Sequence, residues 1–249
     1  MGRIAARVAV GVGVLVAASI VVLGGEVLLA RRGVDLSDRE PYDLDGRVGG
    51  ARDGRVERVV WLGDSTAAGV GASAPDEALP RQVAGLADHP VDLTVLAVSG
   101  ARVDDVLADQ VDDVPVDADT VYVSVGANDT VHLTRAGDFR DRYEQVLAAL
   151  PDGVDVVLLG VPDMGSTPRF AQPLRFVAGV RGGTIDAVIA DLAAAPGRTY
   201  VDIAGETGPA FRRDPGELFA ADDYHPSDAG YARWATAVDA ARRAQEADR

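Results

Sequence analysis

From about residue 56 onward, short apolar segments alternate along the chain with longer amphipathic segments. The apolar segments, rich in β-branched residues, predict five strands, at 58–62, 91–98, 120–125, 154–159 and 199–202. The amphipathic segments predict helices at 76–87, 103–110, 138–150, 173–194 and 227–244. Strands that are apolar throughout are typical of a sheet covered on both faces. The alternation therefore predicts an α/β fold, with a central parallel sheet of about five strands between helices.

Composition and charge exclude several classes of protein. The 249 residues include 24 basic and 39 acidic side chains, for a formal net charge of −15, and no cysteine. The acidic excess argues against a nucleic-acid-binding protein, which needs basic groups to neutralise phosphates. The lack of cysteine excludes disulfides, thiolate metal sites and a cysteine nucleophile. The acidity belongs to residues 57–249, because residues 1–56 carry eight arginines against seven acidic residues.

The first 32 residues have the pattern of an N-terminal transmembrane helix. Residues 8–25 carry no charge, and the 23 residues between Arg7 and Arg31 would rise roughly 34 Å as a helix, enough to cross a hydrocarbon core of about 30 Å. A cleaved secretory signal would have a shorter apolar region, roughly 7–15 residues. The short basic leader favours a cytoplasmic N-terminus, although arginines on both flanks weaken the charge rule. We therefore expect a membrane-anchored protein, with secretion after cleavage as the alternative.

A polar segment separates this helix from the alternating pattern. Residues 33–55 contain Pro41 and several glycines, and they predict a flexible tether. Three regions are therefore expected: an anchor or signal-like helix at 1–32, the tether, and one folded domain at 56–249. With the N-terminus in the cytoplasm, this domain lies outside it.

Polar clusters follow three of the predicted strands, and a fourth cluster precedes the last predicted helix. In chain order they are Gly63-Asp64-Ser65-Thr66, Ser99-Gly100-Ala101, Gly126-Ala127-Asn128-Asp129 and Asp222-Asp223-Tyr224-His225. Helix capping or turn formation explains each cluster taken alone. In parallel sheets, however, functional residues gather at the carboxyl ends of the strands. We therefore expect the four clusters to meet at one edge of the sheet.

The residue types in these clusters are those that acyl transfer by a serine requires. The Ser65 hydroxyl is a weak nucleophile and needs a base, such as His225, within hydrogen-bond reach. The base needs an acceptor on its other ring nitrogen, which Asp222, three residues before it in a turn, can supply. Donors must also face the developing oxyanion. The amides of Ser65 and Gly100 and the side-chain NH₂ of Asn128 can converge as such donors.

Together these residues resemble the sequence blocks of the SGNH (GDSL-type) hydrolase family. Gly63-Asp64-Ser65 matches the first block, with Ser65 as the nucleophile. Gly100 and Asn128 match the second and third blocks, which supply oxyanion donors. Asp222 and His225 match the final Asp-x-x-His block, as orienting acid and general base.

The resemblance covers roughly residues 56–245 and implies a three-layer αβα sandwich of the flavodoxin-like SGNH type. It also implies ester hydrolysis through an acyl-enzyme, without a metal or other cofactor. Asp64 and Thr66, which flank Ser65, are expected to line the cleft. Thr66 departs from the leucine that is common at this position, which bears on substrate more than on catalysis. The family acts on lipids, acylated sugars and small esters, so the resemblance leaves the substrate open.

His132 is the main alternative base, because Asp129 precedes it with the same spacing of three residues. Asp129 also directly follows Asn128, and one short loop can hardly serve both roles. We therefore favour His225 as the base and expect His132 to line the cleft.

Three further patterns compete with this interpretation. Asp223 is an alternative to Asp222, but its carboxylate would point differently from that of a residue three before His225. His89 precedes the second predicted strand, at the opposite end of the sheet, and we expect it on the surface. Residues 69–74 formally resemble a dinucleotide-binding loop, but the predicted strand ends well before them and no helix follows directly. No cluster of metal ligands is evident in the sequence.

The pattern predicts a membrane-tethered serine esterase or deacylase that acts outside the cytoplasm on small-molecule, lipid or glycan esters. The same site would act as an acyltransferase if an acceptor other than water were held in the cleft. The alternative from another class is a catalytically silent binding module displayed on the membrane. The complete set of nucleophile, base and oxyanion residues argues against it, because a silent module has no reason to retain them all.

Overall fold

The computed structural model describes residues 24–26, 34, 36–37, 39–49 and 54–247. The anchor predicted at 1–32 lies outside these residues, except for a short helical stretch at 24–26. Among the described residues, no helix combines the length and the apolar character that crossing a bilayer requires.

The central sheet has six strands in the described part of the chain, in the order β1-β3-β2-β4-β5-β6. They are β1 (Gly46–Val48), β2 (Glu57–Gly63), β3 (Val91–Val95), β4 (Thr120–Ser124), β5 (Asp155–Leu159) and β6 (Arg198–Val201). Strands β2 to β6 run parallel, whereas β1 pairs antiparallel with β3 at one edge. The five predicted strands correspond to β2–β6, so the predicted parallel sheet is confirmed.

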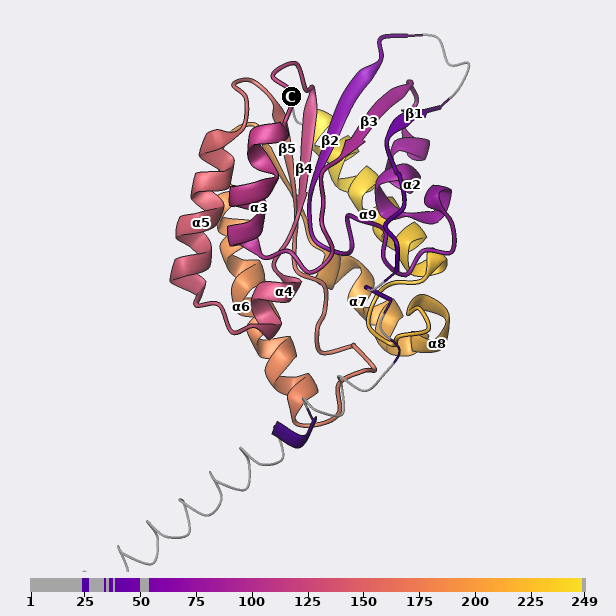
Figure 1. The fold of residues 1–249 in the computed structure, drawn as a ribbon, viewed down its shortest axis with the longest axis vertical. Helices are drawn as coiled ribbons and strands as arrows, with labels where there is room; N and C mark the ends of the chain where they lie inside the picture. The colour runs from indigo at the N-terminus through magenta and orange to yellow at the C-terminus, as the bar shows by residue number, and fades with distance from the viewer. Residues whose placement is uncertain (1–23, 27–33, 35, 38, 50–53, 248–249) are drawn as a thin grey trace, which may run out of the picture.

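Helices cover both faces of this sheet (Figure 1). One face carries α3 (Val103–Asp109), α5 (Ala136–Ala149) and α6 (Leu174–Leu192). The other face carries α2 (Leu79–Leu86), α7 (Ile203–Arg213) and α9 (Asp228–Ala247). Shorter elements are η1 (Pro75–Glu77), η2 (Val111–Asp113), α4 (Ala127–Val131) and α8 (Pro215–Leu218). The arrangement is the predicted αβα sandwich.

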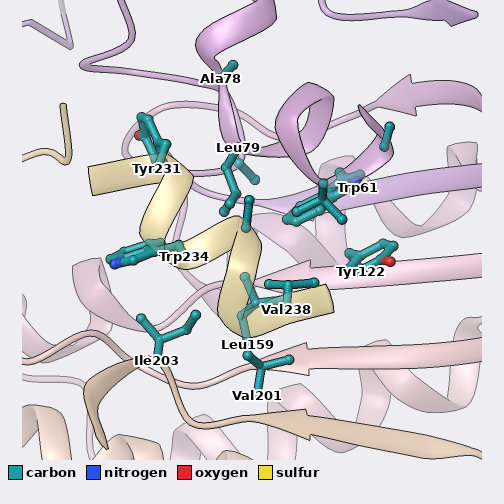
Figure 2. Packing of buried hydrophobic residues seen from close by; sticks show 14 of the residues in the cluster. Trp61, Ala78, Leu79, Tyr122, Leu159, Val201, Ile203, Tyr231, Trp234 and Val238 are labelled. Atoms are coloured by element: carbon teal, nitrogen blue, oxygen red, sulfur yellow. The ribbon is translucent and has the colours of Figure 1, made fainter. Parts of the chain in front are cut away.

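Alternate side chains of β2, β4 and β5 enter two separate apolar cores, which explains why these central strands are apolar throughout. In β2, Val60 and Leu62 pack with residues of α3 and α5. Trp61 points to the other face, where its ring stacks on that of Tyr122 with 4.4 Å between the ring centroids. Figure 2 shows this second core, to which α2 contributes Leu79 and α9 contributes several side chains. Full burial of a large apolar side chain stabilises a fold by about 1.5–3 kcal/mol.

Part of the segment predicted as a flexible tether belongs to the folded domain. Residues 46–48 form β1, and the Leu44 side chain before them is buried in the core. The Asp45 carboxylate accepts the Val95 N–H at 2.8 Å and ties this segment to the end of β3. The tether prediction is wrong for these residues, because the edge of β3 offers backbone partners that composition does not reveal.

The strand order brings the carboxyl ends of β3, β2 and β4 side by side. Strand β2 lies between β3 and β4, so the chain leaves β2 at the point where the strand order reverses. In open α/β sheets the ligand crevice lies at such a point. The segments that follow these strands carry Ser65, Gly100 and Asn128. The fold therefore places three of the predicted site residues at one edge of the sheet.

Candidate active site

The chain turns sharply after β2 and presents Ser65 at the carboxyl end of the sheet. Gly63 has a φ of +145°, and a Cβ at this position would lie 2.1 Å from the carbonyl oxygen of Ser124. Glycine is therefore required where β2 ends beside β4. Beyond it, the Val70 N–H donates to the Ser65 carbonyl at 2.9 Å and helps to close the turn.

A buried side chain that the sequence did not reveal supports this turn. Gln110, directly after α3, is 1% exposed. Its Oε1 accepts the Gly63 N–H at 2.8 Å, and its Nε2 donates to the Gly63 carbonyl at 2.9 Å. The amide thus bonds to both backbone groups of Gly63, as a neighbouring strand would, and the Gly63 carbonyl also accepts the Val98 N–H at 3.1 Å. The pattern predicted Gln110 only as the end of a helix, and no local signal marks its role, because its partner lies 47 residues away along the chain.

His225 and Asp222 meet Ser65 from the loop between α8 and α9. The His225 Nε2 lies 2.9 Å from the Ser65 Oγ, and the His225 Nδ1 lies 2.6 Å from the Asp222 Oδ2. All three side chains are buried. The structure thus brings together the residues predicted as nucleophile, base and orienting acid, in the connectivity of a serine hydrolase triad.

The turn that begins at Asp222 holds its carboxylate in place. The Asp222 Oδ1 accepts the N–H groups of Tyr224 at 3.1 Å and His225 at 3.0 Å. Burial raises the pKa of the Asp222 carboxyl. The hydrogen bonds from the His225 ring and from the N–H groups of Tyr224 and His225, together with the charge of His225, lower it by more. The pKa of Asp222 therefore lies below its ordinary value. Asp223 is exposed and adopts a φ of +56° in the turn, so the structure excludes it as the partner of His225.

The segment after Ser65 packs closely against the loop that carries His225. Gly71 has a φ of +100°, and a Cβ there would lie 2.3 Å from the carbonyl oxygen of Pro226. Gly71, in the segment 69–74 that formally resembles a dinucleotide-binding loop, therefore packs against the His225 loop.

The predicted oxyanion donors lie at the same edge of the sheet. Asn128 lies in the first turn of α4, directly after β4, and its Nδ2 donates to the Ala101 carbonyl at 3.0 Å. Its second side-chain N–H has no partner in the described part of the chain and can serve an oxyanion. Gly100 lies in the turn after β3, with a φ of +84° that suits glycine. Asn128 and His225 line the same cavity.

Asp129 and His132 do not form the alternative acid–base pair. Asp129 is buried, and its Oδ2 accepts the Val103 N–H at the start of α3, at 3.0 Å. The exposed His132 ring instead lies with its Nδ1 2.9 Å from the Asn128 carbonyl oxygen. His132 does line a cavity together with His225.

Asp64 lies beneath the turn, contrary to the expectation that it lines the cleft. It is buried, and its Oδ1 accepts the Thr66 N–H at 3.0 Å and the Thr66 hydroxyl at 2.9 Å. Burial raises the pKa of the Asp64 carboxyl to about 6. Thr66 itself borders a small cavity together with Ser65, as expected.

Two cavities adjoin the His225 ring, and Tyr224 and His225 line both. The smaller has a volume of about 30 Å³, borders Ser65 and is otherwise mostly apolar. The larger has a volume of about 400 Å³, is formed largely by residues of α4 and α6, and borders Asn128. Within the described residues, no group of three or more His, Asp or Glu side chains is placed to hold a metal ion.

Comparison with known protein families agrees with this geometry. Residues 61–233 match the GDSL-like Lipase/Acylhydrolase family. The chain belongs to this family. The predicted SGNH (GDSL-type) resemblance is thereby confirmed, and the GDSL-like family is a family of ester hydrolases.

A relative of this chain is also a GDSL-like esterase. The GDSL-like esterase Rv1075c of Mycobacterium tuberculosis (strain ATCC 25618 / H37Rv) is 33% identical over 179 residues, which cover 69% of this chain and 57% of the relative. The chain thus spans little more than half of that relative's length.

Two solved structures share the fold of this GDSL-like chain. Phospholipase A1 from Streptomyces albidoflavus NA297 is 22% identical, with a TM-score of 0.60 over 74% of this chain and 99% of that chain. The lipase/acylhydrolase from Enterococcus faecalis is 20% identical, with a TM-score of 0.56 over 73% of this chain and 93% of that chain.

Proposed function

We propose that the chain is a serine esterase that cleaves carboxylic esters through an acyl-enzyme intermediate. The observation that carries this proposal is the chain of hydrogen bonds from Ser65 through His225 to Asp222, with 2.9 Å and 2.6 Å between the bonded atoms. An imidazole at this distance, oriented by a carboxylate, activates a serine hydroxyl as a nucleophile. Membership of the GDSL-like family supports the same class of reaction.

In the first half-reaction, the Ser65 Oγ attacks the ester carbonyl carbon while the His225 Nε2 takes the hydroxyl proton. The ionised Asp222 stabilises the imidazolium. The oxyanion of the tetrahedral intermediate faces the amides of Ser65 and Gly100 and the side-chain NH₂ of Asn128. When the intermediate collapses, the bond to the alcohol oxygen breaks, His225 protonates the leaving alkoxide, and the acyl group remains on Ser65.

In the second half-reaction, water takes the place of the alcohol. His225 accepts a proton from the water as its oxygen attacks the acyl carbonyl carbon. The bond to the Ser65 Oγ then breaks, the proton returns to that oxygen, and the carboxylic acid leaves. Neither half-reaction requires a cofactor.

The size of the smaller cavity favours a short acyl group. This cavity borders Ser65 and measures about 30 Å³, whereas a single water molecule needs about 10–15 Å³ of cavity volume on the same measure, so only a group of a few atoms fits. An acetyl methyl group fits such a space, whereas a long chain does not. The alcohol portion then occupies the larger cavity of about 400 Å³. Short-chain esters of glycans, lipid headgroups or small alcohols are the proposed substrates.

We also propose that residues 1–32 anchor the enzyme in a membrane, with the domain outside the cytoplasm. Residues 8–25 are uncharged, as a membrane-spanning helix requires. The stretch at 24–26 lies near the start of α6 (Figure 1), where the Glu26 carboxylate accepts the Leu174 N–H at 2.8 Å. Cell fractionation tests this proposal: the full chain is expected in the membrane fraction, and its recovery as a soluble protein would contradict the anchor.

Hydrolysis of p-nitrophenyl acetate by the purified full chain tests the esterase proposal. We expect turnover by the wild type and its loss in Ser65→Ala, because that substitution removes only the nucleophilic oxygen. Thermal unfolding of the variant checks that its fold is intact. Turnover by Ser65→Ala at the wild-type rate, or no turnover of short esters by the folded wild type, would overturn the proposal.

A further inference from the structure

The larger cavity beside His225 differs in charge from the rest of the chain. The whole chain carries 39 acidic against 24 basic residues. Among the described residues, no aspartate or glutamate lines this cavity, whereas two arginines do, Arg169 and Arg181. The apolar part of the lining comes mainly from α4, α6 and the segment before α6. A concave site lined by a cationic group attracts anions.

Arg181 holds its charge at the wall of this cavity before any ligand binds. It projects from α6, and its Nε donates to the Thr130 carbonyl at 3.2 Å while its Nη2 donates to the Thr134 carbonyl at 2.9 Å. Both acceptors are neutral, and no carboxylate of the described residues forms an ion pair with Arg181. Because its guanidinium is fixed in place and not neutralised, it can bind a carboxylate or phosphate at little entropic cost.

A second arginine, Arg169, lies next to the catalytic loop and lines the same cavity. Its Nη1 donates to the carbonyl oxygens of Val34 at 2.6 Å and Asp222 at 3.3 Å. The carboxylate of Asp222 points instead to the His225 ring. These contacts place the guanidinium between the triad loop and the cavity.

We infer that the larger cavity selects esters whose alcohol portion carries an anionic group, and that Arg181 binds this group. The inference rests on the proposed esterase function and specifies its substrate class. Ser65 borders the smaller cavity and keeps the acyl group in the intermediate, so the alcohol portion lies in the cavity that Arg181 lines. Arg181 is thus a specificity-determining residue, separate from the residues that carry out the bond cleavage.

A matched pair of esters isolates this effect. The ester 4-acetoxyphenylacetate carries a carboxylate on its alcohol portion, whereas its carboxamide is neutral and has the same acetyl group and nearly the same leaving group. We expect the full chain to cleave the anionic ester with a kcat/KM about tenfold higher than that of the neutral ester, in spite of the acidic surface of the protein.

In Arg181→Met, this ratio of the two kcat/KM values is expected to fall to about one, while cleavage of the neutral ester is retained. Arg181→Lys keeps the charge and is expected to keep part of the preference, and 4-acetoxybenzyl phosphate compares phosphate with carboxylate.

Arg142→Met is the matched control, because Arg142 lies on α5, pairs with Asp104 at 2.9 Å and lines neither cavity. A wild-type ratio of one or less, or a ratio that persists in Arg181→Met, would overturn the inference. If Arg181→Met does not fold, the salt dependence of the wild-type ratio decides: NaCl weakens attraction to Arg181 and is expected to lower the ratio, whereas a ratio that NaCl leaves unchanged or raises would overturn the inference. Cleavage of neither ester by the folded wild type would instead contradict the esterase function, and the inference with it.

Discussion

The side-chain amide of Gln110 pairs with the backbone of Gly63, accepting its N–H at 2.8 Å and donating to its carbonyl at 2.9 Å. Gly63 is the last residue of β2, two positions before Ser65. A buried donor or acceptor without a partner costs about 1–3 kcal/mol. Gln110 therefore stabilises the point from which the turn that carries Ser65 begins, although it does not touch Ser65 itself.

Replacing Gln110 by methionine keeps its volume and removes both hydrogen bonds. We expect the free energy of unfolding to fall by about 1–3 kcal/mol, and kcat for p-nitrophenyl acetate to fall about tenfold with little change in KM, because the nucleophile loses its fixed position. Urea unfolding and initial-rate kinetics measure the two effects. Gln82→Met is the control, since the Gln82 Nε2 donates to the Glu77 carbonyl at 2.7 Å and lines neither cavity. Equal loss of kcat in both variants would contradict a positioning role.

The two neighbouring aspartates of the catalytic loop are expected to respond very differently to the same substitution. Asp222→Asn removes the charge that stabilises the imidazolium and the acceptor that fixes its tautomer, so kcat should fall roughly 10³–10⁴-fold. Asp223→Asn alters an exposed side chain and should keep kcat within about twofold. Steady-state kinetics on one short ester compares them. Similar losses in both variants would refute the assignment of Asp222.

Alanine substitutions of the two histidines at the larger cavity, His225 and His132, are also expected to differ strongly in their effect on turnover. His225→Ala removes the base that lies 2.9 Å from the Ser65 Oγ, and turnover should fall roughly 10³-fold or more. His132→Ala should cost less than about tenfold, because its ring contacts the Asn128 carbonyl instead of the nucleophile. Comparable losses, measured with the same ester, would show that His132 takes part in the chemistry.

The stability of the protein is expected to depend on pH through Asp64. Burial raises the pKa of this carboxyl from its ordinary value of 3.8 to about 6 in the folded chain. The folded state therefore binds more protons than the unfolded state between these two values. The stabilisation by the protonated carboxyl is complete below about pH 4 and is lost as the pH rises through about 6.

At roughly 1.4 kcal/mol per pKa unit, this loss amounts to about 3 kcal/mol. In the wild type, the free energy of unfolding is expected to fall between about pH 4 and about pH 7 in part because Asp64 ionises. In Asp64→Asn this contribution is absent, so the fall over the same range is expected to be smaller by about 3 kcal/mol. Urea unfolding of wild type and variant across that range provides the measurement. Parallel pH profiles for the two proteins would show that Asp64 does not titrate in this way.

The parallel sheet could be predicted because its central strands β2, β4 and β5 are continuous apolar runs bounded by polar clusters. Strand β4 begins at the predicted Thr120, and β5 ends at the predicted Leu159. Strand β1 could not be predicted, because Gly46–Val48 contains one apolar residue and forms a strand only by pairing with β3. Helix α7 was also missed, since Pro209 lies inside it and proline disfavours helix interiors.

The triad could be predicted because its signals are local. Asp222 and His225 lie three residues apart in one turn, and Ser65 directly follows a strand with its neighbour Asp64. The buried position of the Asp64 side chain beneath the turn could not be predicted from its place next to Ser65, because successive side chains in a turn point in different directions. The contact of Gln110 with β2 is set by how α3 packs on the sheet, which no sequence window contains.

The position of the covalent adduct formed by a fluorophosphonate probe tests the central claim most directly. Such probes bond to an activated serine oxygen, and the Ser65 Oγ is the one that lies 2.9 Å from the His225 Nε2. After labelling and digestion of the full chain, mass spectrometry should find the adduct on the peptide that contains Ser65, and labelling should disappear in Ser65→Ala. An adduct on a different serine, or unlabelled Ser65 in a folded and ester-cleaving wild type, would contradict the claim that Ser65 is the nucleophile.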